Sequence, residues 1–319
     1  MERKSLKIAI IGAGAVGLYL AWKLAEKGHK VVVFEKGEKI GQKACSCLVS
    51  ERIKYFFDIP DSVIGNRISH CLIHFPKKLV KLNFKPAHFI LEREHLDNIL
   101  FKKALEAGVE IIFNTKIESI PAGFDKIIGC DGALSSVRSG LGMESPSFRL
   151  GIQAFQTLKE EDFSKAVVEV WPIKSGFCWK IPRKDQFEYG AMGEIDSVSA
   201  YFGRFCEEQG IRSRIYLTKT ALIPQGIVLP DSEKITLCGD AAGLTKPWSG
   251  GGIIWGLRAA DILLNNFPSF KKYTREAGRF FSFKIKKGIF VSKLVYFLGE
   301  KASFLLPSEV SRDNDFPFL

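Results

Sequence analysis

The segment that most constrains this fold lies near the start of the chain, where three glycines separate a buried strand from a helix. Residues 7–12 form a continuous apolar run, which is typical of a strand buried in a parallel sheet. Gly12, Gly14 and Gly17 follow in the spacing GxGxxG, and the residues after Gly14 have helical periodicity. A second β-branched strand then ends at Glu35. This order predicts a strand, turn, helix and strand unit of an α/β fold.

Each part of this unit has a task in binding a dinucleotide. Gly12 turns the chain, Gly14 lets the backbone approach a pyrophosphate, and Gly17 allows the helix and strand to pack closely. The helix N-terminus supplies unpaired N–H groups and the positive end of a dipole, while Glu35 can accept hydrogen bonds from a ribose diol. FAD and NAD both contain adenosine diphosphate, so this unit alone does not distinguish between them.

Three later segments of the chain help to distinguish FAD from NAD as the ligand. A short strand leads into an Asp-Gly turn at Asp131 and Gly132, and a helix follows this turn. Arg93 stands at the entry to another helix. Much later, a buried strand ends in Asp240, and a helix that begins with three consecutive glycines comes shortly after it.

This set of motifs resembles the FAD-dependent oxidoreductases of the aromatic-hydroxylase type and, within them, most closely the geranylgeranyl reductases. The match runs from residue 7 to about residue 265. The resemblance implies FAD as cofactor, with NAD(P)H or ferredoxin as the source of electrons, the latter as a separate electron-donor protein. It also implies a set of cofactor-binding residues on the glycine-rich and acidic turns: Gly12, Gly14, Ala15, Gly17, Glu35, Lys36, Arg93, Asp131, Gly132, Asp240, Gly250, Gly251, Gly252 and Ile253.

The later glycine-rich stretch has a chemical use in this interpretation. Asp240, at the end of a strand, can hydrogen-bond a ribitol hydroxyl, and the three glycines allow a flavin ring to lie against the backbone at a helix N-terminus. Negative charge that grows near N1 and O2 of the flavin on reduction would be stabilised by the dipole and free N–H groups there.

Two segments resemble the reductases rather than the hydroxylases. Cys45 takes the place of the family's cysteine beside the flavin and substrate, whereas Cys47 stands where the family has a glycine. We expect Cys45 to be catalytic as a proton source, with shaping of the pocket as the alternative. Phe177 and Trp179 fill an aromatic-x-Trp-x-x-Pro-basic strand, and together with Pro247 we expect them to contact the substrate. No second Cys or His pair follows, so we expect no metal site.

The chain is expected to form two domains and a tail. Alternating apolar and polar runs between about residues 150 and 230 predict an antiparallel sheet. The fold class is therefore α/β (α+β overall), with a Rossmann-type FAD-binding domain and an inserted antiparallel-sheet domain for substrate. We expect the FAD-binding domain at residues 1–67, 91–148 and 231–270, the substrate-binding domain at 68–90 and 149–230, and a helical C-terminal segment at 271–319.

The net charge of the chain and its C-terminal segment, residues 271–319, indicate which partners and which cellular location to expect. Lys and Arg number 46 against 35 Asp and Glu, a net charge of +11 that favours anionic partners. No nucleic-acid motif accompanies this charge, and no targeting peptide or window of ~18 uncharged apolar residues is present, so we expect a cytoplasmic protein. The basic, aromatic tail suggests peripheral association with an anionic membrane surface, or a cover over a lipid pocket. Its apolar helical face comprises Phe290, Val291, Leu294, Phe297 and Leu298. The alternative is a packed helix with a solvated basic face.

The resemblance implies the reduction of isolated double bonds in a prenyl (geranylgeranyl) chain of an isoprenoid lipid or diphosphate. Hydride would pass from N5 of the reduced flavin to one carbon, and a proton would reach the other. Two alternatives keep the same flavin motifs. An NAD(P)H-dependent FAD monooxygenase would hydroxylate a small aromatic substrate, whereas a flavin-binding protein without catalysis would bind FAD and turn over nothing.

Overall fold

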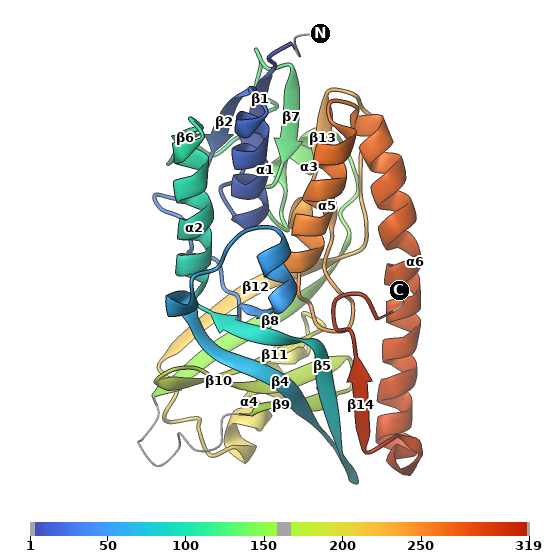
Figure 1. The fold of residues 1–319 in the computed structure, drawn as a ribbon. Helices are drawn as coiled ribbons and strands as arrows, with labels where there is room; N and C mark the ends of the chain where they lie inside the picture. Colours follow the sequence, from blue (N-terminus) through green and yellow to red (C-terminus); the bar gives the residue numbers. More distant parts are fainter. Residues whose placement is uncertain (1–3, 158–166, 318–319) are drawn as a thin grey trace. The chain divides into compact units, whose positions relative to one another are not determined.

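The computed structural model describes residues 4–157 and 167–317 of the 319-residue chain (Figure 1). The chain divides into two compact units, each made of three separate segments. Unit 1 comprises Met1–Gln42, Glu94–Ser147 and Pro224–Lys286, and unit 2 comprises Lys43–Arg93, Phe148–Ile223 and Lys287–Leu319. Each unit is described separately.

Unit 1 is built on a five-stranded parallel sheet in the order β13-β7-β1-β2-β6. Its strands are β1 (Lys7–Ile11), β2 (Lys30–Phe34), β6 (Glu110–Ile112), β7 (Lys126–Gly129) and β13 (Ile235–Leu237). Its helices include α1 (Ala15–Glu26), α2 (Arg93–Glu106), α3 (Ser136–Gly140) and α5 (Ile253–Asn266), with a short 3₁₀ helix η4 (Gly239–Ala242).

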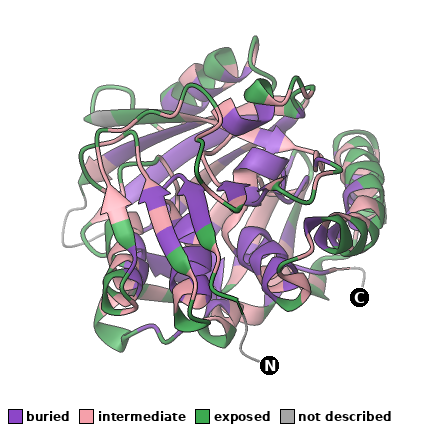
Figure 2. Cartoon of the chain, turned by 90° about the horizontal axis from the view of Figure 1, so that it is seen from above, coloured by how far each residue is buried: buried purple, intermediate pink, exposed green. Residues whose placement is uncertain are grey.

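The core of unit 1 explains why these segments form these elements. Four of the five residues of β1 are buried, as expected for a central parallel strand whose two faces are both covered (Figure 2). Helices α1 and α5 approach closely, because a Cβ placed on Gly256 would lie 2.5 Å from a methyl group of Val16. The predicted Rossmann-type α/β fold is thereby confirmed for this part of the chain.

Unit 2 is built on a nine-stranded mixed sheet in the order β12-β8-β11-β10-β9-β4-β5-β14, with β3 paired to β5. The strands are β3 (Leu48–Ser50), β4 (Ile64–Phe75), β5 (Lys78–Leu91), β8 (Ser147–Thr157), β9 (Val168–Ile173), β10 (Gly176–Pro182), β11 (Gln186–Gly193), β12 (Leu217–Gln225) and β14 (Glu309–Arg312). Short 3₁₀ helices lie at η1 (Glu51–Tyr55), η2 (Asp61–Val63) and η5 (Ser303–Leu305).

Most neighbours in this sheet are antiparallel, as predicted, but two pairs are parallel. Strand β9 runs parallel to β4, and β14 runs parallel to β5. The physical reason is connectivity. Antiparallel neighbours such as β4 and β5 are joined by a tight turn, whereas the parallel partners lie far apart in the sequence and need no hairpin.

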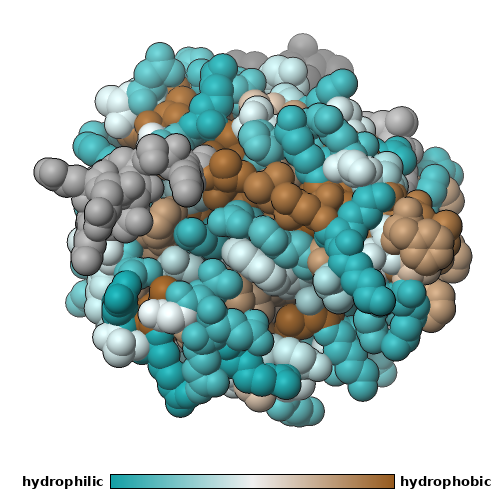
Figure 3. All heavy atoms as spheres, turned by 90° about the horizontal axis from the view of Figure 1, so that it is seen from below, coloured by the Kyte–Doolittle hydropathy of each residue, from teal (hydrophilic) through white to brown (hydrophobic). Residues whose placement is uncertain are grey.

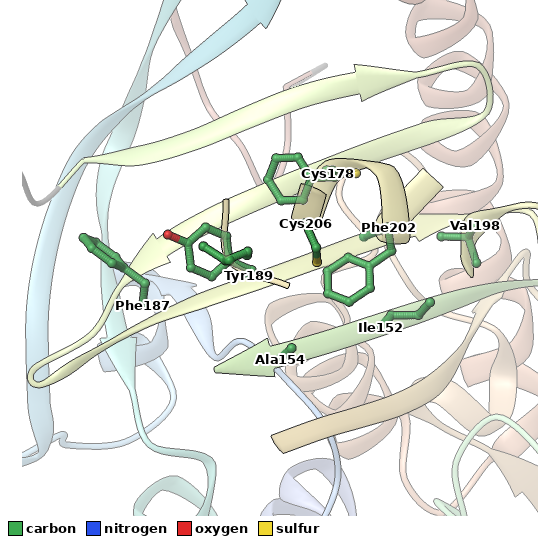
Figure 4. Close-up of a cluster of buried hydrophobic side chains, with 11 residues drawn as sticks. Ile152, Ala154, Cys178, Phe187, Tyr189, Val198, Phe202 and Cys206 are labelled. Atoms are coloured by element: carbon green, nitrogen blue, oxygen red, sulfur yellow. The ribbon is translucent and has the colours of Figure 1, made fainter. Parts of the chain in front are cut away.

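One face of the unit 2 sheet packs against helix α4 (Val198–Glu208). Val198, Phe202 and Cys206 of this helix face Ile152 and other buried side chains of strands β8, β10 and β11 (Figure 4). The opposite face carries a second apolar cluster, with buried Ile181 at its centre and partly buried Trp179 packed against it. The predicted site residues of this sheet therefore lie on the face that α4 does not cover.

The last elements of the chain are helix α6 (Phe270–Lys301) and strand β14. The C-terminal half of α6 packs on the sheet of unit 2, because Gly299 lies against the ring of Phe75 in β4. Beyond it, β14 adds to the outer edge of β5 (Figure 1). Among the described residues, no helix combines the length and apolar character needed to cross a bilayer.

Candidate functional site

The candidate dinucleotide-binding edge of unit 1 is the edge at which its parallel strands end. Strands β1, β2, β7 and β13 lead directly into Gly12, Glu35, Asp131 and Asp240, respectively, or reach them within two or three residues. Because the carboxyl ends of neighbouring parallel strands meet at one edge, the topology gathers these turns from four distant parts of the sequence. Ligands of open α/β sheets bind at such edges.

The first glycine turn is as tight as its spacing predicts. Gly12 has a φ of +105°, and a Cβ on it would lie 2.4 Å from the carbonyl oxygen of Cys130. A Cβ on Gly17 would lie 2.1 Å from the carbonyl oxygen of Gly12. Helix α1 begins at buried Ala15 and has Gly14 as its N-cap, with no side chain capping its first N–H groups. This leaves the positive end of the helix dipole available to an anion.

Glu35 is fixed beside this turn by two backbone hydrogen bonds. The N–H of Ala13 donates to one carboxylate oxygen at 2.7 Å, and the N–H of Gly37 donates to the other at 2.8 Å. Each oxygen of an ionised carboxylate has a second lone pair, so Glu35 keeps capacity to accept from a ribose diol. The neighbouring Lys36 is exposed.

The two carboxylate oxygens of Asp131 have different surroundings. Oδ2 accepts from the N–H and hydroxyl of Ser136 at 2.6 and 2.8 Å and so caps helix α3. Oδ1 is buried and has no hydrogen-bond partner within the part of the chain that the structure describes. A buried acceptor without a donor is costly, which makes this oxygen a suitable partner for a ligand donor. Gly132 follows with a φ of +85°.

The Asp240 turn lies close to Gly252, the last of the three consecutive glycines in unit 1. A Cβ on Gly252 would lie 2.8 Å from Oδ1 of Asp240, so this carboxylate lies against the N-terminus of α5. Helix α5 begins at Ile253 with Gly252 as N-cap and no side-chain capping bond. Gly250 has a φ of +69°, and its N–H donates to the carbonyl of Lys246 at 2.8 Å.

The loop that leads to these glycines is closed by its own backbone. The N–H of Lys246 donates to the carbonyl of Gly251 at 3.1 Å, and the carbonyl of buried Pro247 accepts from the side chain of Gln225 at 3.4 Å. A Cβ on Gly251 would lie 2.8 Å from Cε of Lys246, whose side chain is buried. The hydroxyl of Ser249 is buried without a partner among the described residues.

These features fit an FAD molecule held along the edge of the sheet. The bare backbone at Gly12 to Gly17 suits a pyrophosphate, and the carboxylates of Glu35 and Asp240 suit sugar and ribitol hydroxyls. The orphaned oxygen of Asp131 and the uncapped N-terminus of α5 supply one acceptor and a set of donors. When bound, FAD supplies hydride-transfer chemistry that no side chain possesses.

Unit 2 holds the candidate catalytic loop, residues 45–47. Its three backbone carbonyls all accept hydrogen bonds from the surrounding sheet. The side-chain N–H of Gln153 donates to Cys45 at 3.4 Å, Arg183 donates to Ser46 at 2.6 Å, and the backbone N–H of Leu91 donates to Cys47 at 3.1 Å. The loop is therefore held by β8, the end of β10 and the end of β5.

The backbone at Cys47 has a conformation that favours glycine. Its φ is +49°, in the left-handed region that side chains other than glycine seldom adopt. Its backbone N–H donates to Sγ of half-buried Cys45 at 3.4 Å. This chain therefore keeps the turn that a glycine would make while placing a buried thiol there.

Hydrogen bonding from Cys47 lowers the pKa of Cys45 from its usual value to about 6. Burial of the sulfur opposes this effect, and the positive charges of Arg93 and Lys43 add to it. The effect of Arg93 brings a predicted cofactor residue into the electrostatic environment of the predicted catalytic residue. These effects favour the thiolate form of Cys45 relative to an ordinary cysteine.

The aromatic strand lies on the same sheet as the residues that hold this loop. Trp179 of β10, Gly190 of β11 and Gln153 of β8 are direct cross-strand neighbours in one row. The indole lies on Gly190, where a Cβ would be 2.2 Å from its ring, and its N–H donates to Glu188 at 2.9 Å. The ring of Phe177 lies 5.8 Å from that of Trp179. Unit 2 thus places Cys45, Phe177 and Trp179 around one face.

Several side chains that organise these sites were not among the predicted site residues. Arg138 is buried and donates to the carbonyls of Ala241 at 2.8 Å and Ala133 at 2.7 Å, so it ties the Asp131 and Asp240 turns together. In unit 2, Arg183 and Glu188 form a buried ion pair. Arg138 lies in the helix after the Asp131 turn and Arg183 fills the basic position of the aromatic-x-Trp-x-x-Pro-basic pattern, but neither position identifies the partners of these side chains.

Comparison with known proteins supports this assignment. Residues 10–62 match the NAD(P)-binding Rossmann-like domain family. The chain is 24% identical to a digeranylgeranylglycerophospholipid reductase of Methanothrix thermoacetophila, over 80% of this chain and 75% of the relative. It is also 24% identical to a kynurenine 3-monooxygenase of Flavobacterium psychrophilum, over 82% and 72% of the two chains.

A solved structure extends the likeness to the whole fold. The crystal structure of a geranylgeranyl bacteriochlorophyll reductase-like protein from Thermoplasma acidophilum superposes with a TM-score of 0.75, at 18% identity. The match covers 93% of this chain and 88% of the other. The fold, the glycine turns and the relatives together show that the chain is similar to the geranylgeranyl reductases and to other FAD-dependent oxidoreductases.

Proposed function

We propose that this protein is an FAD-dependent reductase of isolated double bonds in the prenyl chain of an isoprenoid lipid or diphosphate. The observation that carries the proposal is the Cys45 loop, a cysteine with a lowered pKa held rigidly on an aromatic sheet face. The similarity to a reductase of a digeranylgeranyl lipid supports the same substrate class.

An isolated alkene has no carbonyl to polarise, so the protein contributes alignment, exclusion of water and a proton. Phe177 and Trp179 offer an apolar surface for the prenyl chain, with the indole fixed by Glu188. Sγ of Cys45, in its protonated form, would deliver the proton to one alkene carbon, and FAD bound in reduced form would supply the hydride chemistry for the other. A donor whose pKa lies near the working pH combines availability with driving force.

The test is a single turnover without oxygen. Purified protein loaded with FAD is reduced with dithionite and mixed with a geranylgeranylated ether lipid or geranylgeranyl diphosphate. We expect flavin reoxidation with a gain of two hydrogens in the lipid for each flavin, measured by absorbance and mass spectrometry. In Cys45→Ala we expect a large loss of reoxidation rate with FAD retained, while Cys206→Ala, on the α4 side of the sheet, serves as the control.

A different result identifies a different enzyme. If the flavin stays reduced until oxygen is admitted, and oxygen is then consumed in proportion to an aromatic substrate, the protein is a monooxygenase like its kynurenine-hydroxylating relative. If wild type and Cys45→Ala turn over equally, Cys45 has no catalytic role.

We further propose that the C-terminal half of α6 associates with an anionic membrane surface, from which a lipid substrate would be taken. Phe290, Leu294 and Phe297 are 68%, 45% and 62% exposed and share the helix face that points away from the sheet. In Figure 3, hydrophobic atoms are exposed at the right-hand edge, where this end of the helix lies. Lys287 and Lys293 are also exposed, and such cations suit acidic headgroups.

The remaining partner assignments are part of the same proposal. Electrons would come from NAD(P)H or from a ferredoxin-like donor protein, and oxidation of NADPH in the presence of the lipid would distinguish these sources. A cytoplasmic location with peripheral membrane association is the expected setting for this chemistry.

A further inference from the structure

The buried ion pair of Arg183 and Glu188 joins several separate segments of unit 2. Glu188 is 0% exposed and Arg183 only 5%. Nε of Arg183 donates to Oε2 of Glu188 at 2.9 Å, and the second oxygen of that carboxylate accepts from Trp179. A buried pair of this kind pays a large desolvation cost, so a pair with this many additional hydrogen bonds requires a reason.

The other donors of Arg183 reach two segments that are remote from it in the sequence. Nη2 donates to the carbonyl of Ser46 at 2.6 Å. Nη1 donates to the carbonyl of Leu91 at 3.3 Å and to the carboxylate of Glu92 at 2.9 Å. One guanidinium thus joins the residue between the two loop cysteines to the residues immediately before Arg93.

We propose that Arg183 is a positioning residue for the chemistry of Cys45, and that Glu188 orients it for this purpose. By holding the Ser46 carbonyl, Arg183 fixes the left-handed turn that directs Cys47 at the sulfur of Cys45. By holding Leu91 and Glu92, it fixes the start of the segment that presents Arg93. The inference rests on the proposed role of Cys45, but the state of the sulfur is measurable without turnover.

Arginine suits this task for geometric reasons. Its planar fork donates in several fixed directions at once, whereas the ammonium of lysine is a single point charge on a flexible stem. Three residues act electrostatically on the sulfur of Cys45, namely Cys47, Arg93 and Lys43. Arg183 interacts electrostatically with Cys47. The Arg183→Lys variant keeps the positive charge but lacks the guanidinium. We therefore expect it to loosen the turn at residues 45–47 without changing the sign of the local charge.

The experiment measures alkylation of Cys45 by iodoacetamide across pH 5 to 9, with the modified peptide quantified by mass spectrometry. The midpoint of the profile reports the pKa of the thiol, and the plateau at high pH reports its accessibility. We expect a wild-type midpoint of about 6. In Arg183→Lys we expect the midpoint to rise toward the ordinary range, which at the limit lowers the thiolate fraction at pH 7 by ~30-fold.

Two further variants keep the result interpretable. Arg183→Gln/Glu188→Gln removes both charges and so leaves no unpaired buried ion, and it is expected to shift the midpoint as well. Lys180→Met, in β10, breaks the 3.6 Å ion pair to Glu169 of β9 without touching the loop, and its midpoint should match the wild type. Circular dichroism and the melting temperature of each variant establish that it is folded.

The outcomes separate this inference from the proposed function. A folded Arg183→Lys protein with an unchanged midpoint would overturn the positioning role, whatever the enzyme reduces. A raised midpoint in a protein that does not reduce prenyl lipids would support the positioning of Cys45 and leave the substrate assignment wrong. If the double variant fails to fold, Arg183→Lys decides alone; if both fail, Glu92→Gln, which alters the mostly exposed end of the network, gives the same measurement.

Discussion

At the scale of single residues, the unusual backbone conformation of Cys47 determines the environment of Cys45. The sequence shows a cysteine where a glycine is expected, and the structure gives this position a φ of +49°. A residue other than glycine in this region costs on the order of 1 kcal/mol or more, so the conformation is held by the surrounding hydrogen bonds. The same turn aims Cys47 at Cys45 and lowers the pKa of the Cys45 thiol.

A substitution at this position tests the electrostatic link. Cys47→Gly suits the left-handed backbone but removes the thiol that contributes most to the lowered pKa of Cys45. We expect the pKa of Cys45 to rise above about 6, and alkylation at pH 7 to slow several-fold while the melting temperature stays close to that of the wild type. A measured midpoint that does not move would assign the low pKa to Arg93 and Lys43 instead.

The pH dependence of turnover follows from the same group. If protonated Cys45 delivers the proton, the active form is present below the pKa of about 6 and is lost as pH rises through it. We expect the anaerobic reoxidation rate to be highest below pH 6 and to fall by up to ~10-fold per pH unit above it. A rate that rises with pH over this range would exclude Cys45 as the donor.

At the scale of elements, helix α1 depends on the absence of a side chain at its first turn. A Cβ on Gly17 would lie 2.1 Å from the carbonyl oxygen of Gly12. This oxygen belongs to the backbone, so it cannot move aside as the end of a flexible side chain could. Pyrophosphate binding and close packing therefore rely on the same short segment.

Adding one methyl group here gives a prediction for this element. In Gly17→Ala, α1 must move away from the turn, so we expect about 1–3 kcal/mol of destabilisation and a marked loss of FAD. Flavin absorbance after gel filtration and urea unfolding measure the two effects. Gly28→Ala, where a Cβ meets nothing within 4 Å but the φ is +85°, is the control for backbone strain alone.

At the scale of the whole molecule, a net charge of +11 and an exposed aromatic stripe on α6 act together. Charge attracts the protein to acidic headgroups over a distance set by salt, and the aromatic rings then bury apolar surface at the interface. Neither feature alone would give stable association with a membrane.

Vesicle binding separates the two contributions. We expect co-sedimentation with vesicles that contain phosphatidylserine at low salt, and weaker binding as salt is raised. Phe290→Ser/Phe297→Ser should reduce binding several-fold at every salt concentration, because it removes the apolar contact. Leu134→Ser, at an exposed site elsewhere in the chain, is the matched control. Wild-type protein that stays in the supernatant at low salt would contradict the membrane proposal.

The sequence predicts those parts of the molecule that local patterns determine. The glycine spacing, Glu35 and the alternating runs of the second sheet identify a Rossmann unit and an inserted sheet, because their periodicity and turn chemistry are contained in short windows. The parallel pairing of β9 with β4, and the contacts of Arg183 with Ser46, Leu91 and Glu92, join residues about 90 or more positions apart. No local pattern specifies such pairs, since they arise only when the sheet assembles.

Strand β14 covers part of the edge of β5 in the sheet of unit 2. Residues Glu309–Arg312 pair with Lys81–Phe84, in the middle of the fourteen-residue strand β5. Just beyond, Asp313 and buried Asp315 hold the tail through Arg52. An uncovered strand of that length would offer its unpaired N–H and C=O groups to any neighbouring copy. Strand β14 therefore shields this stretch of β5, and we expect truncation before Glu309 to favour self-association through β5.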